Sequence, residues 1–216
     1  MKKIFTLLLV IPAALVHGQK LQLSLSGGVS INSLPSSLKS FSEDFTLPGN
    51  QKMIKAGGIN PVVQINANYV VANRIRVGVT FRYLNTSAMA LDANDAYKKG
   101  EITKPTLQVL PEITYTLIAR SFTLEAGPQV GVAYHFGPKS GGVNVAPIGS
   151  NDKKLGFATG INVRAAYWIK TRVAITASVN PVYNLMKLSG DGLTTISDKN
   201  YSFITVPVVA GVAVNL

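Results

Sequence analysis

Alternation of apolar and polar residues dominates this chain. In residues 74–84, RIRVGVTFRYL, every second position from Ile75 to Tyr83 is apolar or aromatic, and the positions between are polar, charged or glycine. A period of two is typical of a β-strand, because successive side chains point to opposite faces. This stretch alone leaves two interpretations open. The valines fill the core of a soluble barrel, or they face lipid while the arginines line the lumen of a membrane barrel.

Seven further segments alternate in the same way, so the chain is predicted to form eight strands. They lie at residues 21–31, 59–71, 107–117, 122–136, 155–169, 173–185 and 204–216. Three connections are short and four are long, and the two kinds alternate; the short ones are 72–74, 119–121 and 170–172, and the long ones are about 32–58, 85–105, 137–154 and 187–200. This order predicts an up-and-down meander with short periplasmic turns at one end and long outer loops at the other.

Aromatic residues on the apolar face gather near both ends of the strands. Two such girdles are typical of the two interfaces of a membrane, whereas a soluble core has no reason to sort aromatics in this way. The fold class is therefore predicted to be all-β, an eight-stranded antiparallel up-and-down transmembrane β-barrel, with soluble barrels and sandwiches as the alternatives. The girdles comprise Tyr69, Tyr115, Phe122 and Tyr167 near the short turns, and Tyr83, Tyr134, Phe136, Phe157 and Tyr183 near the long loops.

Prolines inside the predicted strands are the exception to the pattern. A closed barrel has no free edge where a missing N–H would be harmless. We therefore expect β-bulges at these positions, which would reverse the inward or outward assignment of a few neighbours. The five prolines are Pro61, Pro111, Pro128, Pro181 and Pro207.

The first eighteen residues, MKKIFTLLLVIPAALVHG, are predicted to be a secretory signal peptide cut before Gln19. Two lysines precede an apolar run that is shorter than the roughly 20 residues of a membrane anchor, which is the alternative. Residues 19–216 then form one outer-membrane β-barrel domain. Cysteine is absent, so an exported protein of this sequence has no disulfides and depends on its strand ladder and its core.

Composition agrees with a membrane barrel and argues against nucleic-acid binding. Hydrophobic residues make up 47% of the chain and the mean hydropathy is +0.25, yet after the signal peptide no apolar run reaches the length of a spanning helix. The net charge is +11. No basic run, recognition-helix pattern or cluster of stacking aromatics accompanies it, so nucleic acid is not a predicted partner. The expected anions are lipid phosphates.

Five charged residues fall on the predicted inner face: Arg76, Arg82, Glu112, Glu125 and Arg164. Arg82 and Glu112 each stand eight residues from their short turns on neighbouring strands, and Glu125 and Arg164 lie on the next neighbouring pair, so we expect these two pairs to form. An eight-stranded barrel is just wide enough for side chains to fill, which predicts a plugged interior. A gate or a small-ion site is the functional alternative.

No catalytic or metal site is predicted. His135 is the single histidine after the signal peptide, and nothing in the spacing joins it to Ser140 and Glu125 as a hydrolase would require. No cysteine or second histidine supports a metal site, and no glycine-rich loop lies between a strand and a helix to hold phosphate, so no cofactor is expected.

Basic residues are sorted by type. Those in or beside the long loops are all lysines, whereas the six arginines lie in the barrel or at its short turns. Lys153 and Lys154 beside Phe157 are candidates for contact with lipopolysaccharide, with solubility as the alternative role. At the short-turn end, contact with phospholipid headgroups is expected for Lys20, Arg74, Arg120, Lys170 and Arg172.

The signal peptide, the eight alternating strands and the closing FITVPVVAGVAVNL together resemble the PorT-like family of outer-membrane β-barrels. The resemblance implies an outer-membrane location and insertion by the barrel assembly machinery, and it implies little about activity. The favoured function is a non-enzymatic integral outer-membrane protein with a structural role or with loops that bind an extracellular or envelope partner. The alternatives are a narrow ion or small-solute channel, a lipid-A-modifying enzyme, and a soluble lipid-binding β-barrel.

Overall fold

A computed structural model describes residues 21–33, 52–56, 58–91, 99–136, 139–141, 154–187 and 200–216. The predicted signal peptide, residues 1–18, lies outside them. Within these ranges no helix has the length and apolarity needed to cross a membrane. The strands are β1 (Leu21–Ser33), β2 (Lys52–Ala56), β3 (Gly58–Ala72), β4 (Ile75–Leu91), β5 (Lys99–Ala119), β6 (Phe122–His135), β7 (Lys139–Gly141), β8 (Lys154–Lys170), β9 (Val173–Val179), β10 (Val182–Lys187) and β11 (Asn200–Asn215).

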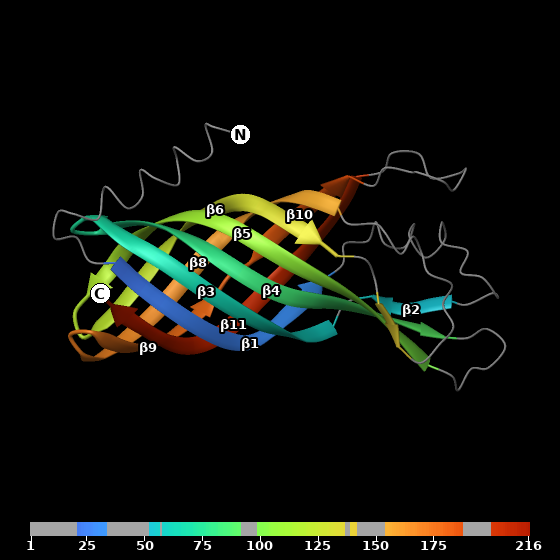
Figure 1. Ribbon diagram of the computed structural model, residues 1–216, viewed down its shortest axis with the longest axis horizontal. Helices are drawn as coiled ribbons and strands as arrows, with labels where there is room; N and C mark the ends of the chain where they lie inside the picture. Colours follow the sequence, from blue (N-terminus) through green and yellow to red (C-terminus); the bar gives the residue numbers. More distant parts are fainter. Residues whose placement is uncertain are drawn as a thin grey trace.

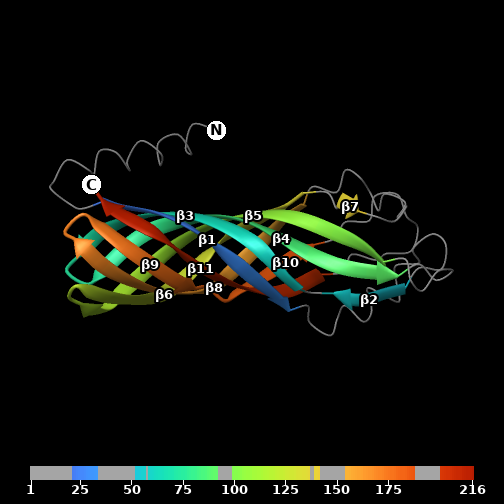
Figure 2. The ribbon, with the colours of Figure 1, turned by 90° about the horizontal axis from the view of Figure 1, so that it is seen from below.

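Eight strand positions close into one antiparallel barrel, which confirms the predicted fold class (Figures 1 and 2). β1 pairs with both β3 and β11, and the remaining pairs follow the chain through β4, β5, β6 and β8. β9 and β10 occupy the seventh position together, since each pairs with β8 on one side and β11 on the other. The short strands β2 and β7 add to the outer ends of β4 and β5.

The strands are strongly staggered around the barrel. Directly paired residues can be followed from strand to strand once around the barrel. Starting at Gln22 of β1, this path ends at Asn32 of the same strand, ten residues closer to the long-loop end. The paired residues between them are Asn68, Gly78, Glu112, Gln129, Gly160, Val182 and Thr205. A stagger of this size corresponds to a strand tilt of about 40°. Residues at equal distances from their turns are therefore not necessarily neighbours.

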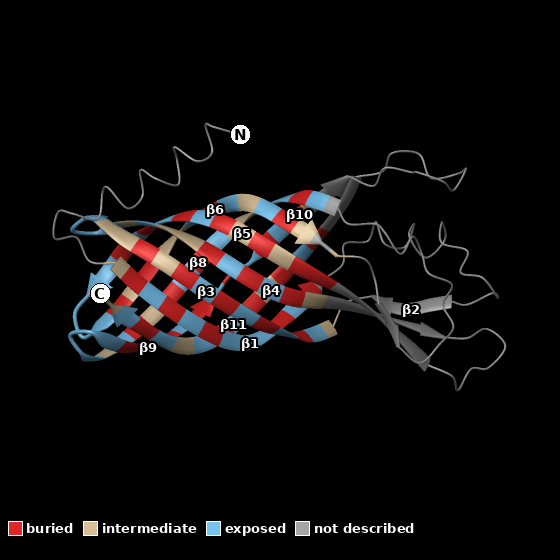
Figure 3. Ribbon diagram, viewed as in Figure 1, coloured by how far each residue is buried: buried red, intermediate tan, exposed pale blue. Residues whose placement is uncertain are grey.

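Along every barrel strand, buried and exposed residues alternate, as the checkerboard in Figure 3 shows. The polarity is inverted relative to a soluble protein: large apolar side chains such as Leu25, Ile65 and Ile175 are exposed, while Gln64, Arg82 and Asn180 are fully buried. In the described part of the chain, buried polar and charged residues outnumber buried hydrophobic ones by more than two to one. The predicted inward and outward assignments of the strand residues are confirmed.

The two aromatic girdles also have the predicted orientation. Phe157 and Tyr167 both lie on the outer face of β8, with 48% and 57% of their surface exposed. Their separation of ten residues corresponds to about 33 Å along the strand and, with the tilt, to about 25 Å along the barrel axis. This matches the height of about 25 Å that the apolar band of an outer-membrane barrel has. In the lower girdle, Phe122 pairs directly with Tyr167.

The prediction of bulges at the prolines is wrong. The pairing register is the same on both sides of each of the five, and the register shifts lie elsewhere, beside the short turns and within the β2–β4 pair. Near two of these prolines, glycines lie where a Cβ would meet the backbone of the neighbouring strand. A Cβ at Gly28 would lie 2.1 Å from the carbonyl oxygen of Val208, next to Pro207, and one at Gly160 would lie 2.2 Å from that of Pro181.

The long connection predicted at 85–105 is mostly strand. β4 and β5 stay paired up to Leu91 and Lys99, so this hairpin projects beyond the barrel, flanked by β2 and β7 (Figures 1 and 2). The sequence of this hairpin does not alternate regularly between apolar and polar residues, because a strand outside the bilayer has no lipid-facing side that must be continuously apolar.

Candidate functional site

The five charged residues predicted in the lumen do point inward. Each occupies the same alternate positions of its strand as the buried polar residues: Arg76 and Arg82 on β4, Glu112 on β5, Glu125 on β6 and Arg164 on β8. Arg76 is half-buried, and the other four are buried. Charges in such an environment are tolerated only with partners that replace water.

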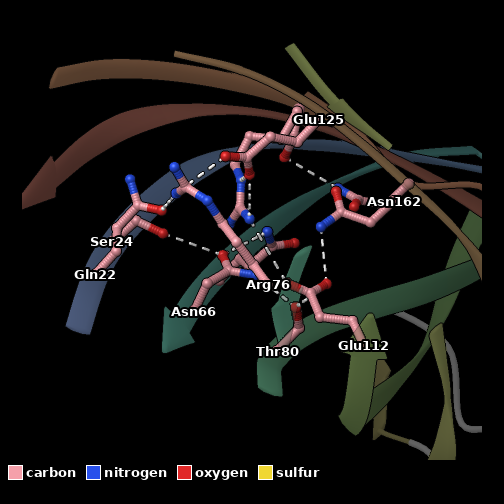
Figure 4. Close-up of polar contacts among 12 residues, drawn as sticks. Gln22, Ser24, Asn66, Arg76, Thr80, Glu112, Glu125 and Asn162 are labelled. Atoms are coloured by element: carbon pink, nitrogen blue, oxygen red, sulfur yellow. Dashed lines mark hydrogen bonds and ion pairs between the residues drawn. The ribbon is translucent and has the colours of Figure 1, made fainter. Parts of the chain in front are cut away.

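Glu125 joins two arginines in the half of the lumen nearer the short turns (Figure 4). Its Oε2 accepts hydrogen bonds from Nε and Nη2 of Arg164 at 3.1 and 2.8 Å, and its Oε1 lies 2.9 Å from Nη1 of Arg76. Arg76 also donates from Nη1 to Gln22 Oε1 at 2.6 Å. The expected Glu125–Arg164 pair thus forms, between residues that are directly opposed in the β6–β8 register.

Glu112 is held mainly by neutral donors. Its Oε2 accepts from Thr80 Oγ1 at 3.1 Å and from Asn162 Nδ2 at 2.7 Å (Figure 4). With the Asn68 amide oriented to satisfy its neighbours, its nitrogen donates to Glu112 Oε1 at 2.8 Å, and its oxygen accepts from Arg164. Arg164 Nη2 lies 3.8 Å from Glu112 Oε1, so this arginine bridges the two carboxylates.

The structure does not pair Arg82 with Glu112. Arg82 is directly opposed to Gln108, while Glu112 is opposed to Gly78, four positions closer to the turns. The strands are staggered, so these two residues, at equal distances from their turns, are not opposed, and the expected ion pair between Arg82 and Glu112 does not form. Arg82 donates instead from Nε to Gln64 Oε1 at 2.9 Å and from Nη1 to Gln108 Oε1 at 3.0 Å, and its buried Nη2 has no partner.

These contacts form one continuous network along the lumen. From Asn184 near the long-loop end, hydrogen bonds lead through Gln108, Arg82, Gln64, Asn66 and Thr80 to Glu112. Asn68 and Arg164 connect Glu112 to Glu125, and Arg76 and Gln22 complete the path at the short-turn end. This network contains three arginines and two glutamates, so the described lumen carries an excess positive charge. Arg82 is the arginine of the network that forms no ion pair with a carboxylate.

Buried apolar side chains form three clusters elsewhere in the described lumen. Leu110, Ala133, Ala158 and Val182 form one buried cluster, and Val62, Leu84 and Val209 form another. Near the short turns, Trp168 packs against Ala166, Ala174 and Ala213. The sequence reasoning missed Trp168, although its position in the alternation, four residues after Arg164, places it on the inner face. The predicted plugged interior agrees with this packing.

A hydrolase site does not form around Glu125. His135 lies on the same strand ten residues away, about 33 Å at 3.3 Å per residue, and the side chains of His135 and Ser140 lie outside the described residues. Glu125 is already occupied by two arginines. Where the structure describes the chain, no three His, Cys, Asp or Glu side chains gather as a metal site would require.

Of the residues predicted to contact lipopolysaccharide, the structure places Phe157 on the outer wall in the upper girdle. Lys154 is the first residue of β8, three positions before Phe157, but its side chain lies outside the described residues, as does all of Lys153. The juxtaposition of the two lysines with Phe157 thus stays a prediction.

Comparisons with known proteins find similarity to solved structures only, at low sequence identity. No protein-family model matches the sequence, and no curated protein matches it. The outer membrane protein OprG from Pseudomonas aeruginosa is 10% identical, over 92% of this chain and 96% of its own, with a TM-score of 0.49. A major outer membrane protein from Thermus thermophilus is 14% identical, over 93% of this chain and 100% of its own, with a TM-score of 0.46. The outer membrane protease OmpT from Escherichia coli is 9% identical, over 93% of this chain and 98% of its own, with a TM-score of 0.42. Likenesses at this level assign no activity.

Proposed function

We propose that this chain is a non-enzymatic integral protein of the outer membrane of a Gram-negative envelope, in which a filled barrel anchors loops that bind a partner or support the envelope. The observation that carries the proposal is the inverted polarity of a closed barrel. Every backbone group of such a barrel can pair within the sheet, which is the requirement for crossing lipid with strands.

Lipid is the solvent that this outer wall fits. Large side chains such as Leu25, Ile65 and Ile161 are at least half exposed between two aromatic girdles, and soluble monomers rarely expose a continuous apolar belt of this kind. A soluble lipid-binding barrel would need an apolar cavity, whereas the centre of this lumen is occupied by the charged network. The soluble alternative therefore has no support in the arrangement of the side chains.

Heat-modifiability tests the location and the fold together. The protein is expected in the detergent-extracted membrane fraction, and its unboiled form is expected to migrate differently from its boiled form on an SDS gel, because folded outer-membrane barrels resist SDS. Release by osmotic shock without detergent, or identical migration of both samples, would overturn the proposal.

The role of the loops is inferred from what the barrel lacks. In the described lumen no three metal-ligating side chains gather, and a hydrogen-bonded network of buried polar side chains runs along it; function concentrates in loops on rigid scaffolds. Shortening the four long connections while keeping the eight barrel strands should abolish adhesion or partner binding without changing heat-modifiability. Unchanged binding by the shortened protein would count against a loop function.

The PorT-like resemblance, insertion by the barrel assembly machinery and lipopolysaccharide contact through Lys153, Lys154 and Phe157 are further parts of this proposal. The basic loops and the exposed Phe157 support contact with a phosphorylated lipid. Lipopolysaccharide binding by the K153Q/K154Q variant should weaken, and the loss should shrink at high salt. A lipid-A-modifying activity is the enzymatic alternative, and an unchanged lipid A mass after overexpression would exclude it.

A narrow channel is the second candidate, favoured by the continuous polar network and the excess charge at Arg82. The apolar clusters and the paired charges argue for a closed path. In planar bilayers we therefore expect no conductance from the wild type. Steady single-channel steps that change in the E125Q variant would establish the channel instead.

A further inference from the structure

We propose that the short-turn end of the barrel binds anionic phospholipids of the inner leaflet, through a site centred on Arg74 and Tyr115 and supported by basic residues at the other two turns. This inference rests on the proposed membrane location and goes beyond it. It names the class of headgroup that the barrel selects and the residues that select it.

Each short turn carries one exposed arginine. Arg74 lies between β3 and β4, Arg120 between β5 and β6, and Arg172 between β8 and β9, where the exposed Lys170 accompanies it. The turns gather at one end of the barrel (Figures 1 and 2), and none of the described residues in or beside them is acidic: residues 69–77, 115–124 and 165–175 contain no Asp or Glu. No Asp or Glu side chain of the sequence flanks these cations, unlike the arginines of the lumen. Leu216, the last residue of the sequence, lies beside the turn of Arg172, because the Asn215 N–H donates to the Arg172 carbonyl at 2.9 Å, so the site is centred on the turn of Arg74.

Arg74 is directed toward the lipid side of the wall. Its Nη1 lies 3.4 Å from the hydroxyl oxygen of Tyr115, and Tyr115 is a member of the lower aromatic girdle with 45% of its surface exposed. Tyr115 pairs with Ile75, the first residue of β4. The guanidinium therefore lies at the depth where a girdle tyrosine meets the headgroups. It keeps further N–H donors for a phosphate, and the Tyr115 hydroxyl can donate to the same group.

The other two turns lie next to each other and also combine basic residues with aromatic residues of the lower girdle. The Trp168 backbone N–H donates to the Ser121 carbonyl at 2.8 Å, which joins the turn of Arg120 to the end of β8 at Lys170. On the outer wall beside them, Phe122 pairs with Tyr167. Arg120, Lys170 and Arg172 thus lie within a few residues of two outward-facing aromatics. In this arrangement the rings can contact acyl chains while the charges meet phosphates.

The absence of Asp and Glu side chains in these turns favours an anionic headgroup over a zwitterionic one. A zwitterionic headgroup brings its own ammonium, which no Asp or Glu of these turns receives, while the only charge of the phosphatidylglycerol headgroup is its phosphate. Each basic residue near an anionic surface contributes about a fivefold preference. An acidic periplasmic protein would also suit the charge, but the position of Arg74 against a lipid-facing tyrosine favours the lipid.

The test uses the full mature chain in nanodiscs of phosphatidylcholine with a minor fraction of phosphatidylglycerol, with spin-labelled lipids reporting the composition of the boundary shell. We expect several-fold enrichment of phosphatidylglycerol around the wild type, a reduced enrichment for R74Q and for Y115F, and none for R74Q/R120Q/K170Q/R172Q. The matched control K52Q/K55Q/K99Q/K139Q removes the same charge from β2, from β7 and from the start of β5 in the projecting hairpin, and it should retain the enrichment.

Three results would overturn the inference: no enrichment around the wild type, equal loss in the control, or full enrichment in the quadruple turn variant. Salt-sensitive capture of an acidic periplasmic protein by turns that select no lipid would assign them to that partner instead. Heat-modifiability of every variant separates this outcome from failure of the proposed function. A barrel that folds and inserts without selecting lipid refutes only the inference, whereas a chain that does not insert refutes both.

Discussion

Replacing Glu125 by glutamine is the most informative perturbation of the lumen. Glu125 accepts two hydrogen bonds from Arg164 and pairs with Arg76 at 2.9 Å, with 3% of its surface exposed. Glutamine keeps the shape and removes the charge. Two arginines then lose the carboxylate they share, and the excess positive charge of the described lumen rises by one.

The magnitude follows from the geometry. At about 2.9 Å and an effective dielectric constant of about 20, each pair gains roughly 6 kcal/mol of gross attraction. Most of this offsets desolvation, but removing one partner leaves the other buried and uncompensated, which costs about 3–5 kcal/mol. The E125Q variant should therefore lose about 3–5 kcal/mol of unfolding free energy. E112Q should lose less, about 1–3 kcal/mol, because three neutral donors hold Glu112 and its nearest arginine is 3.8 Å away.

Trp168 is the single tryptophan of the chain and packs inside the barrel, so its fluorescence reports urea-induced unfolding in lipid vesicles. The matched control is T176V, which removes a buried hydroxyl that has no partner and should be neutral or slightly stabilising. A double-mutant cycle with R164Q isolates the coupling of the pair. An E125Q variant within about 1 kcal/mol of the wild type would show that the ion pairs do not hold the lumen together.

Three further tests, two of them with a matched control, address the packing and the lipid-facing wall. G28A should prevent normal closure between β1 and β11, because its Cβ would lie 2.1 Å from a backbone oxygen, whereas G27A meets nothing nearer than 3.9 Å and should fold; equal heat-modifiability of the two would contradict this. L110A should lose about 2–5 kcal/mol in the urea assay through the cavity it leaves, and a loss below about 1 kcal/mol would mean that the cluster is loosely packed. I65K, midway between the girdles, should lose about 2–4 kcal/mol in vesicles, and V71K beside a turn about 0–1 kcal/mol; similar losses would place the bilayer elsewhere.

The amino-acid pattern alone was enough to predict the architecture and the facing of the strands. A strand in lipid needs an apolar side chain at every second residue. The alternation in segments such as 59–71 therefore shows which side chains face lipid and which face the lumen. The same requirement placed the charged residues in the lumen and the aromatics at two depths. The Glu125–Arg164 ion pair could also be predicted from the sequence, because these residues are directly opposed on neighbouring strands.

Which side chains meet across the lumen depends on the closed barrel. The ten-residue stagger separates Arg82 from Glu112 and gives Arg82 two glutamines instead, and no local pattern encodes a stagger that is set by closing the whole sheet. Closure likewise brought Trp168 against Ala174 and Ala213, and it placed glycines where neighbouring strands approach. Beyond the membrane, the β4–β5 hairpin had no lipid to impose alternation. Its extent was therefore set by backbone pairing, which one strand's sequence does not reveal.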